Sequence, residues 1–177
     1  IQNATAWCNS ALCAERVVDS IEEQSILQAS EPALCASDGV WSYGELNQRA
    51  SRLSRRLRDA MVRVDQAQSA HVPILFEKSR DAIVAMLAIW KLGASFVPLD
   101  PSMPQERLGY ILGKTKAQLV LTSPRHADKA SRLGVTSLVV DSKSHTLPSV
   151  LCAQGPLCRS AVAGDTAYVL FTSGSTG

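Results

Sequence analysis

The segment HVPILFEKSRDAIVAMLAIWKLGASFVPLD, residues 71–100, carries the strongest indication of the fold class. It predicts a strand over 71–76, a nearly all-apolar helix over 80–91 and a second strand over 95–98. Strands joined by a helix of this length are typical of a parallel sheet. The alternation continues with predicted helices over 105–114 and 125–133 and predicted strands over 118–121, 137–140 and 166–172. We therefore expect an α/β protein with a mostly parallel sheet flanked by helices on both faces.

The residues before this segment predict a smaller amino-terminal unit. Apolar residues among acids and glutamines over 17–30 indicate a surface helix, which Glu31-Pro32 ends because the residue before proline disfavours helical dihedrals. Short strands over 33–36 and 40–43 flank the turn Ser37-Asp38-Gly39, a typical hairpin sequence. We expect this small hairpin to lie outside the main sheet.

A long amphipathic helix is predicted over 43–63, with Ser42 as its N-cap and Glu45 completing a capping box. The helix also carries several arginines that could form a surface for nucleic acid, and these are Arg49, Arg52, Arg55, Arg56, Arg58 and Arg63. A solvated helix face is the favoured interpretation, because no aromatic residue is interleaved for base stacking.

The overall composition argues against nucleic acid and membrane as partners. With 18 basic and 16 acidic residues, the net charge of +2 produces no field that would attract either. The longest apolar stretch, 82–90, is far shorter than the roughly 20 residues that a membrane-spanning helix needs. An apolar content of 46% is enough for an ordinary globular core.

The cysteines and histidines form no recognisable metal or disulfide pattern. The five cysteines, an odd number without a Cys-x-x-Cys pair, predict free thiols and a cytoplasmic location. The three histidines have no metal-ligand spacing to a cysteine or carboxylate, so we predict no metal site. The cysteines are Cys8, Cys13, Cys35, Cys152 and Cys158, and the histidines are His71, His126 and His145.

The candidate ligand site is a loop of glycines and hydroxyl residues at the end of the sequence. Glycines let backbone N–H groups converge on a phosphate, and hydroxyls add donors without bulk. The loop follows a predicted strand, and ligands of open parallel sheets bind at the carboxyl ends of strands. A polar linker or turn is the alternative interpretation, and the Gly-Lys-Ser/Thr ending of a Walker loop is lacking. The predicted phosphate-binding residues are Thr172, Ser173, Gly174, Ser175, Thr176 and Gly177.

Three motifs in order resemble the adenylation domains of fungal nonribosomal peptide synthetases, which are adenylate-forming enzymes. LFTSGSTG, residues 170–177, resembles the phosphate loop of that superfamily. KLGASFVPLDP, residues 91–101, and WSYGEL, residues 41–46, resemble the second and first core motifs of amino-acid-activating domains. The resemblance covers residues 17–177, and residues 1–16 are expected to be an interdomain linker.

Most of the other singled-out positions are expected to be structural. Asp81 and Trp90 depart from the usual family residues, but both lie in the scaffold. Gly93 is expected to permit a sharp turn after a helix, and Asp100, which precedes Pro101, is expected to cap a turn or helix. No catalytic residue is predicted within this sequence.

The resemblance implies an ATP-dependent ligase that converts an amino acid to an aminoacyl adenylate. It further implies Mg²⁺ as cofactor, and transfer of the acyl group to phosphopantetheine on a carrier domain, with carrier and condensation domains in cis. Since residue 1 is not Met and the phosphate loop stops at Gly177, we expect a piece of a longer protein that is inactive alone. The alternatives are a stand-alone acyl-CoA or aryl-acid ligase of the same superfamily, and a non-catalytic assembly domain. The sequence VPLDP, residues 97–101, favours the peptide synthetases.

Overall fold

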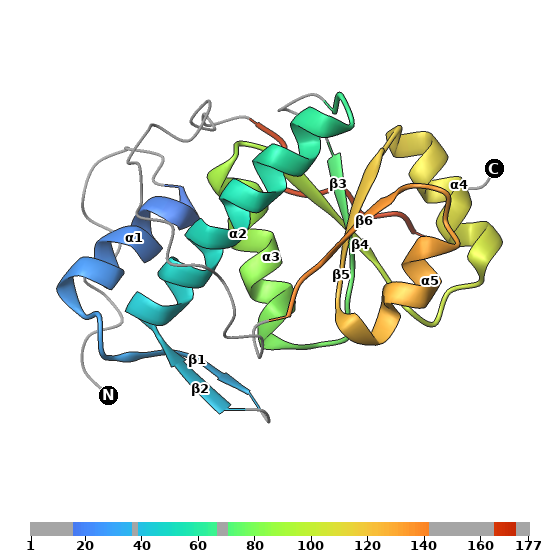
Figure 1. The fold of residues 1–177 in the computed structure, drawn as a ribbon. Coiled ribbons are helices and arrows are strands. Elements are labelled where there is room, and N and C mark those ends of the chain that lie inside the picture. The colour runs from blue at the N-terminus through green and yellow to red at the C-terminus, as the bar shows by residue number, and fades with distance from the viewer. Residues whose placement is uncertain (1–15, 37–38, 67–70, 142–164, 173–177) are drawn as a thin grey trace.

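The computed structural model describes residues 16–36, 39–66, 71–141 and 165–172 (Figure 1). None of the helices in these ranges combines the length and the apolar character required to cross a bilayer. In chain order the elements are α1 (Val17–Leu27), β1 (Pro32–Ala36), β2 (Gly39–Ser42), α2 (Tyr43–Arg63), β3 (His71–Leu75), α3 (Arg80–Lys91), β4 (Ser95–Leu99), α4 (Gln105–Thr115), β5 (Leu119–Thr122), the 3₁₀ helix η2 (Pro124–His126), α5 (Ala127–Ser131) and β6 (Thr136–Val139).

The main sheet confirms the predicted α/β class. Its four strands are parallel and lie in the order β4-β3-β5-β6. The longest pairing runs from His71 opposite Ser95 to Leu75 opposite Leu99. Helices α2 and α3 lie on one side of the sheet, and α4 and α5 lie on the other (Figure 1). The helices thus cover both faces, as the alternation of strands and helices predicted.

The core is divided by the sheet because successive strand side chains point to opposite faces. Val72 and Ile74 of β3 belong to the cluster packed with α2 and α3. Leu75, the next residue in β3, packs instead with Leu108 and Ile111 of α4. Strands that are buried on both faces are near-continuous apolar runs, which explains the composition of β3 and β5.

The predicted ends of two helices needed correction. The helix predicted over 17–30 ends at Leu27, with Gln28 as its C-cap. The helix predicted over 125–133 is divided between η2 and α5, because Pro124 at the first position begins a 3₁₀ turn. Both changes leave the order of elements intact.

The prediction of a strand over 166–172 was wrong. Instead of a strand, this segment forms a single parallel bridge, between Tyr168 and Phe96 of β4. Phe96 N donates to Ala167 O at 3.3 Å, and Val169 N donates to Phe96 O at 3.0 Å. Continuation of the ladder would require a donor two residues after Phe96. Residue 98 is proline, which has no N–H, so the ladder cannot continue.

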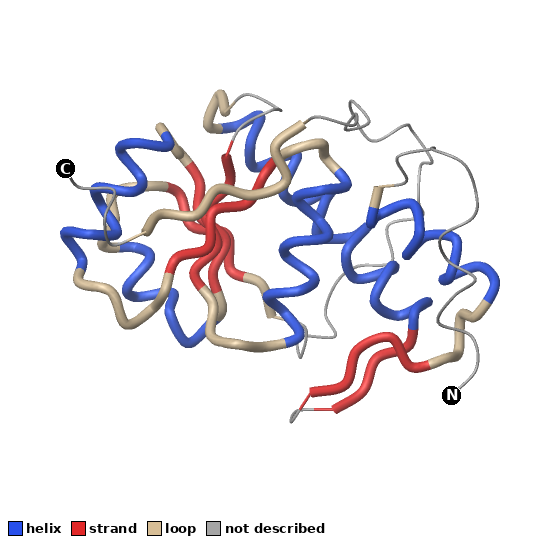
Figure 2. Tube along the Cα trace, turned by 180° about the vertical axis from the view of Figure 1, so that it is seen from behind, coloured by secondary structure: helices blue, strands red, loops and turns tan. Residues whose placement is uncertain are grey.

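The hairpin of β1 and β2 lies outside the main sheet as predicted, and appears as a separate two-stranded ribbon in Figure 2. The capping box of α2 is also confirmed. Ser42 N donates to Glu45 Oε2 at 3.0 Å, and Glu45 N donates to Ser42 Oγ at 3.3 Å. The box fixes the direction in which the chain turns from the hairpin into α2.

Two of the α2 arginines contact other parts of the same chain. The Arg49 guanidinium lies 4.4 Å from the ring centre of Trp41, whose other partner is Arg80 at 4.2 Å. Arg56 Nη2 donates to Val139 O at 3.3 Å. These contacts attach the hairpin and the end of β6 to the helical layer.

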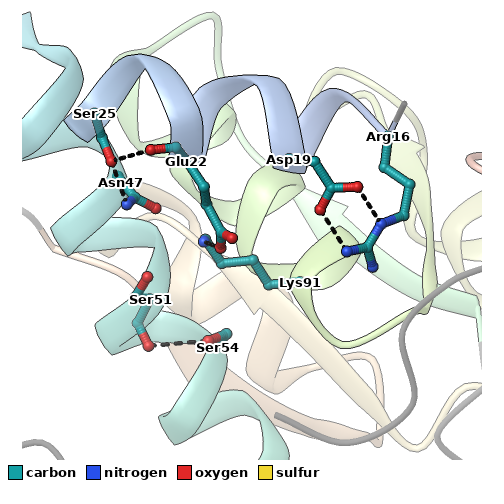
Figure 3. A network of polar contacts seen from close by, with 8 residues as sticks. All are labelled: Arg16, Asp19, Glu22, Ser25, Asn47, Ser51, Ser54 and Lys91. Atoms are coloured by element: carbon teal, nitrogen blue, oxygen red, sulfur yellow. Dashed lines mark hydrogen bonds and ion pairs between the residues drawn. The ribbon is translucent and has the colours of Figure 1, made fainter. Parts of the chain in front are cut away.

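Helix α1 is joined to the body by polar contacts as well as by packing (Figure 3). Lys91 at the end of α3 forms an ion pair with Glu22, and its side chain is only 3% exposed. Asn47 Nδ2 of α2 donates to Ser25 Oγ at 2.8 Å. Within α1 itself, Arg16 Nε at the N-cap donates to Asp19 Oδ2 of the first turn at 2.7 Å. Because a buried ammonium needs a partner, Glu22 makes α1 an integral part of the described fold.

Candidate functional site

The segment that leads into the glycine-rich loop lies along β4. Trp90 Nε1 donates to Ala167 O at 2.8 Å, and the rings of Phe96 and Tyr168 stack with their centres 5.7 Å apart. Val169 and Phe171 pack against the core cluster on the α4 side. Thr172 consequently lies at the carboxyl edge of the sheet, where a parallel α/β protein binds its ligands.

Thr172 is the described part of the predicted phosphate loop. Thr172 is exposed to solvent, and its main-chain O accepts a hydrogen bond from Arg107 Nη2 at 3.1 Å. The other predicted members lie outside the described residues, and these are Ser173, Gly174, Ser175, Thr176 and Gly177.

The turn after β4 is held by hydrogen bonds between side chains and the main chain. Asp100 Oδ1 accepts a hydrogen bond from Ser102 N at 2.8 Å, which confirms the expected turn cap. Hydrogen bonds from the main chain and side chain of Ser102 lower the pKa of Asp100. Lys129 Nζ donates to Pro101 O at 2.7 Å and to Met103 O at 2.6 Å. Gly93, with φ of 68°, makes the predicted sharp turn before β4.

Sequence reasoning missed a polar cluster at the carboxyl ends of β3 and β5. Ser123 Oγ donates to Glu77 Oε2 at 3.0 Å, and His126 Nε2 lies 2.9 Å from the same oxygen. Burial favours a higher pKa for Glu77, but the hydrogen bonds from its own main chain and from Ser123, with the nearby charges of His126 and Arg125, lower that pKa overall. The sequence did contain a signal for this cluster, because Glu77 follows the β3 strand and Ser123 follows the β5 strand. The carboxyl ends of parallel strands meet at one edge of the sheet.

Replacing Glu77 with Gln is expected to destabilise the protein at pH 7 by less than about 1 kcal/mol, because the carboxylate is partly exposed and screened. The pKa of Glu77 is lower in the folded state than its ordinary value of 4.5. Its stabilising contribution is therefore complete above pH 4.5 and is lost as the pH falls through the folded-state pKa.

Urea unfolding of wild type and Glu77→Gln at pH 7 and at pH 3 measures this contribution. The difference between the two proteins should be smaller at the acid pH. The exposed Glu23→Gln variant serves as the matched control. A difference for Glu77→Gln that is the same at both pH values would contradict the prediction.

Within the described ranges, no group of three or more His, Cys, Asp or Glu side chains is arranged to hold a metal ion. Cys35 on β1 is an exposed free thiol. The other four cysteines, on which the prediction of free thiols also depends, lie outside the described residues.

Comparison with known proteins identifies a family and several relatives of similar sequence. The family described as AMP-binding enzyme matches residues 21–177. D-lysergyl-peptide-synthetase subunit 2 of Epichloe festucae var. lolii is 44% identical over an alignment of 172 residues, and the match covers 94% of this chain and 12% of that protein. Nonribosomal peptide synthetase TES of Alternaria alternata is 40% identical over 161 residues, which are 91% of this chain and 3% of that protein. The chain thus spans a small part of the relatives that it matches.

Two solved structures that resemble this fold carry adenine-nucleotide ligands. The nonribosomal peptide synthetase FmoA3 bound to α-methyl-L-serine-AMP superposes with a TM-score of 0.72 and 27% identity, over 90% of this chain and 18% of that one. Its AMPPNP-bound form gives a TM-score of 0.72 and 26% identity, over 88% and 16% of the two chains. With the family match over residues 21–177 and the fungal peptide synthetase relatives, these similarities show that the chain belongs to the AMP-binding enzyme family.

Proposed function

We propose that the protein carrying this chain is a nonribosomal peptide synthetase that activates an amino acid with ATP, and that residues 172–177 hold the ATP phosphates. The observation that supports this most directly is the position of Thr172 at the carboxyl edge of a parallel sheet, with TSGSTG beginning there. The relatives named above are peptide synthetases, and their sequence similarity extends over nearly the whole of this chain.

The chemistry requires the loop to reduce electrostatic repulsion. The amino acid carboxylate attacks the α-phosphorus of ATP, an acyl phosphate bond forms, and the bond to pyrophosphate breaks. Both reactants are anions, so donors aimed at the phosphate oxygens favour the transition state. In this proposal Thr172, Ser173, Ser175 and Thr176 donate through hydroxyl or main-chain groups, while Gly174 and Gly177 permit close approach.

The loop also suits the cation that accompanies ATP. Mg²⁺ is usually held by substrate phosphates and a few oxygen ligands, and Thr172, an exposed residue at this edge, carries a hydroxyl oxygen of the required kind. When bound, the ion neutralises charge on the phosphates. Transfer to phosphopantetheine, with carrier and condensation domains in cis, belongs to the proposed function of the complete protein. The exposed Cys35 thiol is consistent with a reducing, cytoplasmic location.

Exchange of labelled pyrophosphate into ATP tests the proposal. The complete protein should catalyse exchange that depends on one amino acid or a few, while a polypeptide of residues 1–177 should not exceed a no-enzyme control. Exchange supported by aryl or fatty acids but by no amino acid would favour the acyl-CoA or aryl-acid ligase. A folded complete protein that shows no exchange with any acid would favour the non-catalytic assembly domain.

A further inference from the structure

The chain loses its pairing with the sheet just before it enters the phosphate loop. Within residues 165–172, the parallel pairing with β4 ends at Val169, because Pro98 cannot donate the next hydrogen bond. Residues 170–172 therefore leave the sheet without a ladder to fix their direction. Any fixed direction of the loop must come from other contacts.

Arg107 makes such a contact at the last described residue. Its Nη2 donates to Thr172 O at 3.1 Å, across 65 residues of sequence. The same guanidinium lies 5.4 Å from the ring centre of Tyr110, one turn along α4. A guanidinium held over an aromatic ring has fewer rotamers to lose when it forms a hydrogen bond than a freely rotating one. Arg107 is thus oriented towards the loop by its own helix.

The helix that carries Arg107 is itself firmly placed. Leu108, the next residue, is fully buried, and Ile111 one turn later is 1% exposed. The turn between β4 and α4 is held by the Asp100 cap and by the two hydrogen bonds from Lys129. The main chain at Arg107 therefore cannot move away from Thr172 without displacing core residues.

We propose that Arg107 is a positioning residue for the phosphate loop. Its bond to Thr172 O fixes the main chain at residue 172, the last residue before the glycines and hydroxyls of the loop, where the ladder with β4 no longer does so because Pro98 cannot donate. This inference rests on the proposed function of residues 172–177. It also assigns a role to the motif over 91–101, because the turn that follows β4 holds the helix that places Arg107.

Amide hydrogen exchange measures the positioning without reference to activity. In the complete protein, Arg107→Ala should speed exchange about tenfold in the peptide covering 170–177, with β3 and β4 unchanged. Arg56→Ala is the matched control, since it removes a comparable bond from a guanidinium to the Val139 carbonyl. That bond lies at β6, the last strand of the sheet, whereas the segment that leads into the loop lies beside β4 at the other end of the strand order. Exchange over 170–177 that is unchanged by Arg107→Ala would overturn the inference.

Pyrophosphate-exchange kinetics provide the second readout. For Arg107→Ala the KM for ATP should rise about tenfold while the KM for the amino acid stays within about twofold. Arg107→Lys should restore part of the loss, because an ammonium can donate to the Thr172 carbonyl but lacks the planar guanidinium that lies over the Tyr110 ring. An equal rise in both KM values, with faster amide exchange throughout the sheet, would show general destabilisation and would contradict positioning. Absence of exchange in wild type would refute the proposed function, and the amide exchange would still decide the role of Arg107.

Discussion

Gly174→Ala is expected to lower amino-acid-dependent pyrophosphate exchange by the complete protein about a hundredfold. In the proposed function the loop main chain must approach the ATP phosphates closely, and a glycine allows this because no Cβ intervenes. An added methyl group would move the main-chain donors away from the phosphate oxygens. A displacement of about 1 Å in a group that positions the substrate can cost a hundredfold in rate. The change should appear in kcat/KM for ATP, with the KM for the amino acid little altered.

Gly109 in α4 offers a matched control for this substitution. A Cβ added at Gly109 would meet nothing within 4 Å, and the residue is exposed. Gly109→Ala should leave exchange activity unchanged and stabilise the helix by up to about 1 kcal/mol. Full activity of a folded Gly174→Ala protein would contradict the phosphate role of the loop. A loss shared equally by both variants would instead indicate a general sensitivity to the substitution.

Leu57→Ala is expected to destabilise the fold by about 3 kcal/mol, within the range of roughly 2–5 kcal/mol seen for buried leucines. Leu57 is fully buried in α2 and belongs to the cluster that packs α2 and α3 against the sheet. Removal of its isobutyl group leaves a cavity that the surrounding residues can fill only in part. Such a loss is a large fraction of the stability of an ordinary domain. Urea unfolding followed by circular dichroism, with soluble yield as a second readout, measures the effect.

Val62 lies five residues further along the same helix and serves as the control. It is 71% exposed, so Val62→Ala should change the free energy of unfolding by no more than about 0.5 kcal/mol. Equal effects for the two variants would show that α2 is not packed as described.

The elements of this fold were predictable because their signals are local. The periodicity of apolar residues predicted α2 and α3, and the paired positions of Ser42 and Glu45 predicted the start of α2. The Ser37-Asp38-Gly39 turn indicated the hairpin, and the composition of residues 172–177 indicated a phosphate loop. Each of these inferences depends on residues that are near one another in the sequence. The structure confirms those that concern fold, while the role of the loop remains a prediction.

The contacts around the candidate site depend on strand order, which local patterns do not contain. Glu77 and Ser123 meet because β5 pairs beside β3, and Arg107 reaches Thr172 because the segment of Tyr168 lies beside β4. The same arrangement ends the strand predicted over 166–172, since the missing N–H of Pro98 matters only once a neighbour is placed on that side of β4. Local sequence thus specifies helices and strands through periodicity and capping. The pairing of distant segments is selected by the packing of the whole chain, and it brings Arg107, Glu77 and Thr172 to one edge of the sheet.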